Sequence, residues 1–240
     1  MRIDAFDLQP GHRLAGRYEV MRKLGAGWES EVYLVRELTT GIERAAKLFF
    51  PERNVNNRIA RLTALKLHQL RMCPALLQYI TQDVIEFRNT PVSMLVSDFV
   101  DGQLLKEFLA DQPGRRLPRF EALHVLWSLA CALEPIHDRH EYHGDLHDGN
   151  IIIVRRGLGF DIKLIDIFHR PRRRSLNIQD DVVDLIRIFY DLLGGQRTYA
   201  RQPRQVKNIC RGLKRSLISE RFRHASQLRR HLERLPWDDE

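Results

Sequence analysis

The stretch from Tyr142 to Asn150 reads Tyr-His-Gly-Asp-Leu-His-Asp-Gly-Asn and runs directly into four apolar residues, Ile151 to Val154. It contains a carboxylate, Asp145, and five residues later a carboxamide, Asn150. A carboxylate can orient an acceptor hydroxyl and a carboxamide offers magnesium a neutral oxygen, and phosphoryl transfer from ATP uses both. The sequence therefore predicts a catalytic loop that leads into a short β-strand. The alternative is a polar surface turn.

This loop resembles the H-x-D-x-x-x-x-N catalytic loop of the protein kinase-like superfamily. The resemblance implies that Asp145 is the catalytic base and Asn150 a magnesium ligand. The order His-Gly-Asp-Leu-His from His143 to His147 is similar to aminoglycoside phosphotransferases as much as to protein kinases. The loop alone therefore leaves open whether the acceptor is a protein or a small molecule.

An alternating pattern over residues 17–36 predicts a hairpin whose turn is rich in glycine. Glycines at such a turn let backbone N–H groups approach phosphate oxygens. The turn is similar to the kinase glycine-rich loop G-x-G-x-x-G-x-V, with a serine in place of the third glycine. The resemblance implies that these residues hold the nucleotide: Gly25, Ala26, Gly27, Ser30 and Val32.

A further strand is predicted over residues 42–50, and Lys47 lies within it among apolar neighbours. A lysine in such a setting is costly without a counter-charge. The sequence Ala45-Ala46-Lys47 resembles the kinase lysine motif, which implies that Lys47 contacts the α- and β-phosphates of ATP and takes part in catalysis. The alternative is a lysine that extends from an edge strand into solvent.

The apolar spacing over residues 54–70 predicts an amphipathic helix in the place of kinase helix C. That helix normally carries a glutamate that pairs with the lysine, whereas this chain has no Asp or Glu from Arg53 to Gln82 and places Ala64 there. We expect Lys47 to pair instead with Asp166 or Glu31, or with the nucleotide phosphates.

Two more strands are expected over residues 76–87 and 92–96, joined by a turn. The segment that follows resembles the kinase hinge. The resemblance implies that backbone groups of Asp98 and Val100 bind adenine and that Ser97 is a small gatekeeper residue.

Asp166 ends an apolar strand 16 positions after Asn150, in the place of the kinase D-F-G aspartate. The resemblance implies that Asp166 and Asn150 together hold Mg²⁺, which prefers few protein oxygens plus phosphates and water. Phe168 replaces the glycine of that motif. The alternative for Asp166 is a turn former at the end of a strand.

Only a short connection joins Asp166 to Asp181, with no Ala-Pro-Glu motif, so the activation segment is truncated. Asp181 is expected to brace the catalytic loop through backbone N–H groups. The stretch from Arg221 to Leu228 resembles the R-F-x-x-A-x-x-L ending of eukaryotic-like bacterial Ser/Thr protein kinases, and the space before Val206 leaves no room for helix G. Helices are predicted over residues 54–70, 104–110, 118–139, 179–193, 206–218 and 224–235.

Together these features predict a bilobal α+β kinase-like fold. Residues 1–101 are expected to form an N-lobe with a five-stranded antiparallel sheet and one helix, and residues 102–240 a mainly helical C-lobe. The two lobes make one kinase domain. The content of 43% hydrophobic and 29% charged residues is ordinary for a globular protein.

The chain has a formal net charge of +8, which favours an anionic partner such as a nucleotide. A basic cluster could dock an acidic partner, and its lack of aromatic residues disfavours nucleic-acid recognition. No apolar run reaches the roughly 20 residues that span a bilayer, and we expect a cytoplasmic protein. Three separated cysteines are expected to be free thiols. The basic cluster comprises Arg170, Arg172, Arg173 and Arg174.

Three functions remain open from the sequence. The first is an ATP- and Mg²⁺-dependent kinase that phosphorylates Ser or Thr of a protein. The second is the same chemistry on a small hydroxylated molecule, which the short segment after Asp166 favours. The third is a pseudokinase that binds a nucleotide or a partner, which Ala64 and Phe168 favour.

Overall fold

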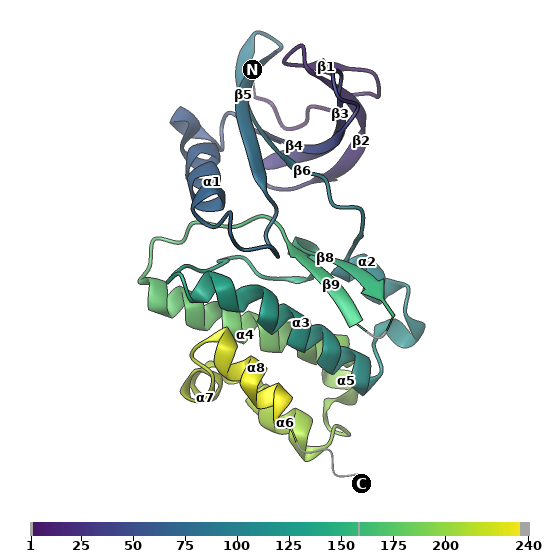
Figure 1. Cartoon of the computed structure of the whole chain (residues 1–240), viewed down its shortest axis with the longest axis vertical. Helices are drawn as coiled ribbons and strands as arrows, with labels where there is room; N and C mark the ends of the chain where they lie inside the picture. The colour runs from purple at the N-terminus through teal and green to yellow at the C-terminus, as the bar shows by residue number, and fades with distance from the viewer. Residues whose placement is uncertain (1, 158, 236–240) are drawn as a thin grey trace. The chain divides into compact units, whose positions relative to one another are not determined.

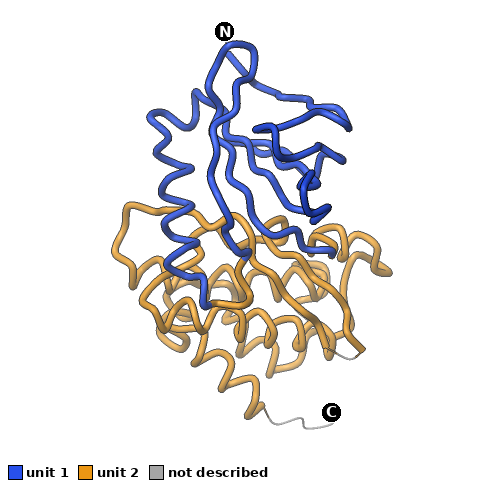
Figure 2. The backbone as a smooth tube through the Cα atoms, turned by 45° about the horizontal axis from the view of Figure 1, so that its top comes forward, with its two compact units in different colours: residues 1–72, 77–101 blue, residues 73–76, 102–240 orange. Residues whose placement is uncertain are grey.

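A computed structural model describes residues 2–157 and 159–235 of the chain. It divides into two compact units, coloured blue and orange in Figure 2. Unit 1 comprises Met1–Met72 and Leu77–Asp101, and unit 2 comprises Cys73–Leu76 and Gly102–Glu240. Residues 1, 158 and 236–240, which fall within the predicted lobes, lie outside the described residues. An antiparallel sheet in unit 1 and mainly helices in unit 2 confirm the predicted α+β class.

Unit 1 contains an antiparallel sheet with the strand order β1-β2-β3-β4-β6-β5 (Figure 1). Six strands pair in it where the sequence predicted five, because Leu14 pairs with Tyr18 ahead of the predicted hairpin. Helix α1 (Arg58–Gln69) lies against β5 and β6. The strands are β1 (Arg13–Leu14), β2 (Tyr18–Ala26), β3 (Ser30–Glu37), β4 (Glu43–Phe49), β5 (Tyr79–Phe87) and β6 (Thr90–Asp98).

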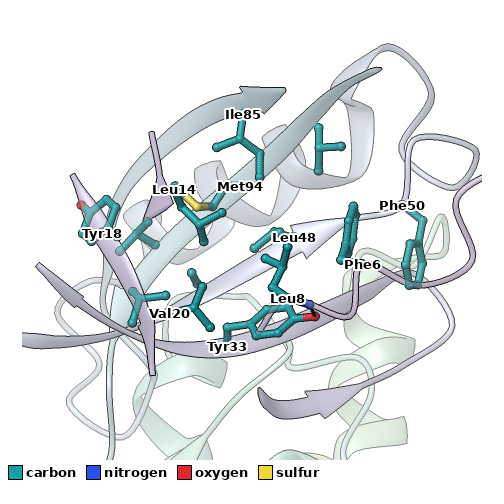
Figure 3. Packing of buried hydrophobic residues seen from close by; sticks show 14 of the residues in the cluster. Phe6, Leu8, Leu14, Tyr18, Val20, Tyr33, Leu48, Phe50, Ile85 and Met94 are labelled. Atoms are coloured by element: carbon teal, nitrogen blue, oxygen red, sulfur yellow. Dashed lines mark hydrogen bonds between the residues drawn. The ribbon is translucent and has the colours of Figure 1, made fainter. Parts of the chain in front are cut away.

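The hydrophobic core of unit 1 includes the segment that precedes the sheet (Figure 3). Ile3, Phe6 and Leu8 are each less than 10% exposed. The Phe6 ring stacks on Phe50 with centroids 5.2 Å apart, and it meets the edge of Phe87 at the same distance. Burying three large side chains is worth several kcal/mol. Ile3, Phe6 and Leu8 are therefore part of the core of unit 1.

Unit 2 combines helices with a small sheet in the order β7-β8-β9. Helix α3 is its scaffold, and it packs against α4, α8 and β9. Pro118 precedes α3, and most apolar side chains of the helix are buried. Trp127, which helical spacing places with the buried side chains, is instead 41% exposed. The elements of this unit are β7 (Gln103–Leu104), α2 (Leu105–Ala110), α3 (Arg119–His137), β8 (Ile151–Arg156), β9 (Gly159–Leu164), α4 (Arg174–Leu192), α5 (Gln196–Tyr199), α6 (Arg204–Cys210), α7 (Arg215–Arg221) and α8 (Ala225–Glu233).

The predicted single helix over residues 206–218 is wrong. The chain forms α6 and α7 instead, because Arg211, Gly212 and Leu213 all adopt positive φ angles that interrupt a right-handed helix. Helix α4 begins five residues earlier than predicted, at Arg174, which shortens the connection from Asp166 further.

None of the helices within the described residues combines the length and the apolarity that a bilayer crossing needs. The structure pairs none of the three cysteines in a disulfide. Burial raises the pKa of the Cys131 thiol to about 11 and that of Cys210 to about 12. Both thiols are therefore poor nucleophiles at neutral pH.

Candidate active site

The glycine-rich turn connects β2, which ends at Ala26, to β3, which begins at Ser30. The Gly27 N–H donates to the Ser30 carbonyl at 2.9 Å, and the Ser30 side chain is buried. A Cβ atom added at Gly25 or Gly27 would meet nothing within 4 Å, and neither residue has a positive φ. Neither the backbone conformation nor the packing of the chain requires glycine at positions 25 and 27. A ligand that approaches the backbone closely would require it, because a side chain would then be in the way.

Lys47 lies in the middle of the sheet, where it is paired with Val32 of β3 and Leu95 of β6. Its side chain is only 13% exposed, which excludes an edge-strand lysine extended into solvent. The Lys47 ammonium forms an ion pair with the Glu29 carboxylate at 3.0 Å, and it lies 5.4 Å from the centroid of the Phe49 ring. The sequence analysis missed Glu29, although it is the one acidic residue within the glycine-rich turn.

Glu31, one of the two carboxylates expected near Lys47, is bound elsewhere. Its Oε1 accepts from Lys23 at 2.7 Å, and its Oε2 accepts from the Tyr33 hydroxyl and from the N–H groups of Phe6 and Asp7. Burial opposes ionisation of Glu31, but hydrogen bonds from Lys23 and Tyr33 outweigh it and lower its pKa. Glu31 therefore anchors the first residues of the chain.

The segment predicted as the hinge begins within β6. The Asp98 N–H donates to the Gln78 carbonyl at 3.1 Å, and the Asp98 carboxylate pairs with Arg44 at 2.6 Å. The N–H of Val100 has no hydrogen-bond partner among the described residues. Ser97 is buried, with its hydroxyl 3.5 Å from the Ala45 carbonyl. The Val100 N–H is thus available for the hydrogen bond to adenine that the sequence predicted. The Asp98 N–H is already used, which leaves the Asp98 carbonyl as its backbone group for adenine.

Asp145 and Asn150 contact each other directly in unit 2. The Asn150 amide nitrogen donates to the Asp145 carbonyl at 2.9 Å and to its carboxylate at 3.2 Å. No donor to the Asn150 amide oxygen is recorded within the described residues. Asp145 itself is about half exposed, and His147 lies 3.7 Å from its carboxylate. The loop thus presents one accessible carboxylate beside one amide oxygen, a donor set that suits Mg²⁺.

The chain on both sides of Asp166 is hydrogen-bonded to this loop. The Ile165 N–H donates to the Asn150 carbonyl at 3.0 Å, and the Phe168 N–H donates to the His143 carbonyl at 3.0 Å. Asp166 has a φ of 58°, a left-handed conformation that is uncommon for a residue other than glycine. Aspartate tolerates this conformation better than most residues, and the angle places a sharp turn of the backbone at Asp166, just after β9.

The His143 ring connects the backbone at Asp145 to the backbone at Ile165, the residue before Asp166. Its Nδ1 accepts from the Asp145 N–H at 3.3 Å, and its Nε2 lies 2.8 Å from the Ile165 carbonyl. Because Nδ1 accepts, Nε2 carries the N–H that faces the Ile165 carbonyl. Gly144, the next residue, has a φ of 89°, and a Cβ there would lie 2.7 Å from the Phe168 carbonyl oxygen. A residue with a side chain would therefore not fit at this position.

Asp181 is fully buried beneath the catalytic loop and braces it, as the resemblance implied. Its carboxylate accepts the N–H groups of His143 at 2.6 Å and Gly144 at 2.9 Å, and it lies 3.2 Å from Nε2 of His137. Burial alone would raise the pKa of Asp181, but the bond from His137 and the nearby backbone donors lower it. The loop is thus held by a buried charge that α4 supplies.

Asp184, one turn further along α4, is a second, partly buried carboxyl. Burial and the neighbouring charge of Asp181 raise its pKa to about 6. The folded chain therefore holds this proton more tightly than the unfolded chain, so stability falls as the pH rises from about 4 to about 6. We expect Asp184→Asn to stabilise the fold by about 1–2 kcal/mol above pH 6 and by nothing near pH 4. Urea unfolding at the two pH values measures this, and an equal gain at both would contradict it.

The basic cluster is partly neutralised within unit 2. Arg172 pairs with Asp180 at 3.1 Å, Arg170 lies 4.0 Å from the same carboxylate, and Arg174 pairs with Glu141 at 3.0 Å. These pairs reduce the charge that the cluster offers to solvent. Docking of an acidic partner there stays a prediction.

Comparison with known proteins places these features in a family. The protein kinase domain family matches residues 18–169, more than half of the 240-residue chain. The chain is 29% identical over 154 residues to the serine/threonine-protein kinase pkn2 of Myxococcus xanthus, and 27% identical over 158 residues to PrkC of Bacillus subtilis. The matches cover 64% and 65% of this chain but only 18% and 23% of those proteins.

Two further relatives match over nearly the whole chain. The probable serine/threonine-protein kinase YbdM of Bacillus subtilis is 25% identical over 243 residues, with 95% of this chain and 92% of that protein covered. The crystal structure of the Mycobacterium tuberculosis PknI kinase domain superposes with a TM-score of 0.69 at 21% identity, covering 94% of this chain and 98% of that one. At this identity the superposition establishes the fold. With the match to the family over residues 18–169, these findings show that the chain belongs to the protein kinase domain family.

Proposed function

We propose that the chain is an ATP- and Mg²⁺-dependent phosphotransferase that acts on Ser or Thr hydroxyls of a protein. The observation that carries this proposal is the catalytic loop, in which Asp145 is accessible and Asn150 turns its amide nitrogen toward Asp145. Its amide oxygen then remains for a metal ion. Membership of the protein kinase domain family supports the same chemistry.

In this mechanism, Asp145 accepts a hydrogen bond from the acceptor hydroxyl and orients it in line with the γ-phosphate. The acceptor oxygen forms a bond to the γ-phosphorus while the bond from that phosphorus to the β–γ bridging oxygen breaks. ADP leaves, and the hydroxyl proton passes to Asp145 late in the transfer. The transferred phosphoryl group comes from ATP, and the oxygen to which it becomes bonded comes from the acceptor.

The other proposed residues bind the nucleotide. Lys47 neutralises the α- and β-phosphate oxygens, and the turn from Gly25 to Ser30 covers them. Backbone groups of Asp98 and Val100 bind adenine. Asn150 and Asp166 hold Mg²⁺, which when bound offsets the negative charge of the β- and γ-phosphates. Gly25 and Gly27 support this assignment, because a Cβ atom added at either would meet no atom of the described residues within 4 Å.

A small hydroxylated acceptor is the second candidate, and one observation favours it. Helix α4 begins at Arg174, so only seven residues separate it from Asp166. A segment of this length offers little surface on which a peptide acceptor could bind. The His-Gly-Asp-Leu-His order shared with aminoglycoside phosphotransferases points the same way.

Incubation with γ-labelled ATP and Mg²⁺ tests these candidates. The acceptors are a general Ser/Thr-containing protein mixture and a panel of hydroxylated metabolites and aminoglycosides. Label on protein Ser or Thr supports the proposal, and label on a small molecule only supports the second candidate. No transfer to any acceptor, with a melting temperature that rises on adding nucleotide, would contradict both and identify a pseudokinase.

A further inference from the structure

We propose that Glu29, in the glycine-rich turn, positions the Lys47 ammonium in place of the missing helix carboxylate. This inference rests on the proposed function, because it assumes that Lys47 contacts a nucleotide. It concerns a residue that neither the catalytic loop nor the resemblance to kinases singles out. Glu29 is a positioning residue in this account, since it acts through Lys47.

The first step is the charge balance around Lys47. Its side chain is 13% exposed and that of its neighbour Phe49 is fully buried, so its ammonium is largely removed from water. An ammonium in such a place is costly unless a carboxylate lies beside it. Helix α1 cannot supply one, because the chain has no Asp or Glu between Arg53 and Gln82, and Ala64 has only a methyl group. The Glu29 carboxylate at 3.0 Å supplies that charge.

The second step is the anchoring of Glu29. The Phe50 N–H donates to the Glu29 carbonyl at 2.9 Å, which fixes its backbone at the end of β4. Ser30, the next residue, pairs with Phe49 in the sheet. The Glu29 side chain is only 19% exposed. A carboxylate held at both backbone and side chain loses little further freedom when it orients a lysine, so it can fix the ammonium at low entropic cost.

The third step is what this arrangement implies for the turn. A carboxylate on a helix is separate from the turn that covers the phosphates. It can therefore hold the lysine in any conformation of that turn. Here the turn that is proposed to cover the phosphates also carries a counter-charge of Lys47. The conformation of the turn and the placement of the Lys47 ammonium are therefore coupled in this chain. Glu29 also brings negative charge near the phosphates, which offsets part of the affinity gained by fixing Lys47.

The test compares Glu29→Gln with the wild-type chain. Glutamine keeps the shape of the side chain and removes the charge, so the charge-assisted contact to the Lys47 ammonium is lost. We expect kcat to fall by about 10- to 100-fold, while KM for ATP and the Kd of Mg²⁺-ADP change by less than about threefold. Glu29→Asp should retain an intermediate kcat. The control is Glu43→Gln, an exposed residue at the start of β4, which should leave kcat unchanged.

A second readout does not depend on catalysis. The ¹⁵N resonance of the Lys47 ammonium, assigned by its loss in Lys47→Arg, should shift in Glu29→Gln and exchange its protons at least about threefold faster. It should be unaffected in Glu43→Gln. If the wild-type chain transfers no phosphate, the proposed function fails while this resonance still tests the role of Glu29.

Two results would overturn the inference. One is an unchanged kcat and an unchanged Lys47 resonance in Glu29→Gln, which would mean that other groups position the ammonium. The other is nucleotide binding that tightens about tenfold or more with kcat maintained. That result would identify Glu29 as a competitor of the phosphates rather than a positioning residue.

Discussion

Replacing Asp145 by asparagine is expected to lower phosphoryl transfer by about 10²- to 10⁴-fold, the usual contribution of a general base. Asparagine is nearly isosteric and still offers an oxygen to the Asn150 amide, which lies 3.2 Å from the carboxylate. It cannot accept the acceptor's proton. Initial rates with labelled ATP measure the loss, and calorimetry with Mg²⁺-ADP should show a Kd within about threefold of wild type.

Asp148 provides the matched control for this experiment. It lies in the same loop, its side chain is 54% exposed, and its recorded ion-pair neighbour is His147 at 3.9 Å. Asp148→Asn removes the same charge from the same surface, and we expect transfer within about twofold of wild type. Equal losses in the two variants, or parallel losses of transfer and nucleotide binding in Asp145→Asn, would mean that Asp145 has a role other than the proposed one.

Replacing Asp181 by asparagine should destabilise the fold by about 3–5 kcal/mol, the cost of breaking a buried charge network. Its carboxylate oxygens receive the N–H groups of His143 and Gly144 and lie beside the His137 ring. An asparagine can accept through one oxygen only, so its NH₂ group would face a donor and leave buried hydrogen-bonding groups unsatisfied. Urea unfolding near neutral pH measures the effect.

The pH dependence gives a second check on Asp181. The pKa of this carboxyl lies below its ordinary value when folded, so its stabilisation is present above the unfolded pKa of about 4 and is lost as the pH falls through the folded pKa. The difference between wild type and Asp181→Asn should therefore shrink in acid.

Asp161→Asn serves as the control for Asp181. Its side chain is 68% exposed and pairs with Arg156 at the surface, so we expect a change of at most about 1 kcal/mol. A loss for Asp181→Asn no larger than this would show that the buried carboxylate does not brace the loop.

The features that the sequence predicted well are those in which a local pattern determines the geometry. The loop from His143 to Asn150 has a fixed spacing, so the contact between Asp145 and Asn150 follows from a single turn of chain. The buried stripe of α3 follows from helical periodicity. The bracing role of Asp181 came from resemblance to kinases rather than from any local pattern.

The features that the sequence did not predict depend on contacts between distant segments. Glu29 was missed because its pairing with Lys47 depends on the register of β3 against β4. The burial of Phe6 depends on Phe50 and Phe87, which lie far along the chain. The break between α6 and α7 was missed because an apolar spacing continues through Gly212, while the backbone there turns left-handed.

The most direct test of the account is a crystal structure of the full chain with Mg²⁺ and a non-hydrolysable ATP analogue. The account predicts the Lys47 ammonium on the α- and β-phosphates, with its contact to Glu29 retained, and the metal ion held by the Asn150 amide oxygen and the Asp166 carboxylate. It predicts Asp145 facing the γ-phosphate across a space for the acceptor hydroxyl. A nucleotide bound without contact to Lys47, or a metal ion that touches neither Asn150 nor Asp166, would contradict it.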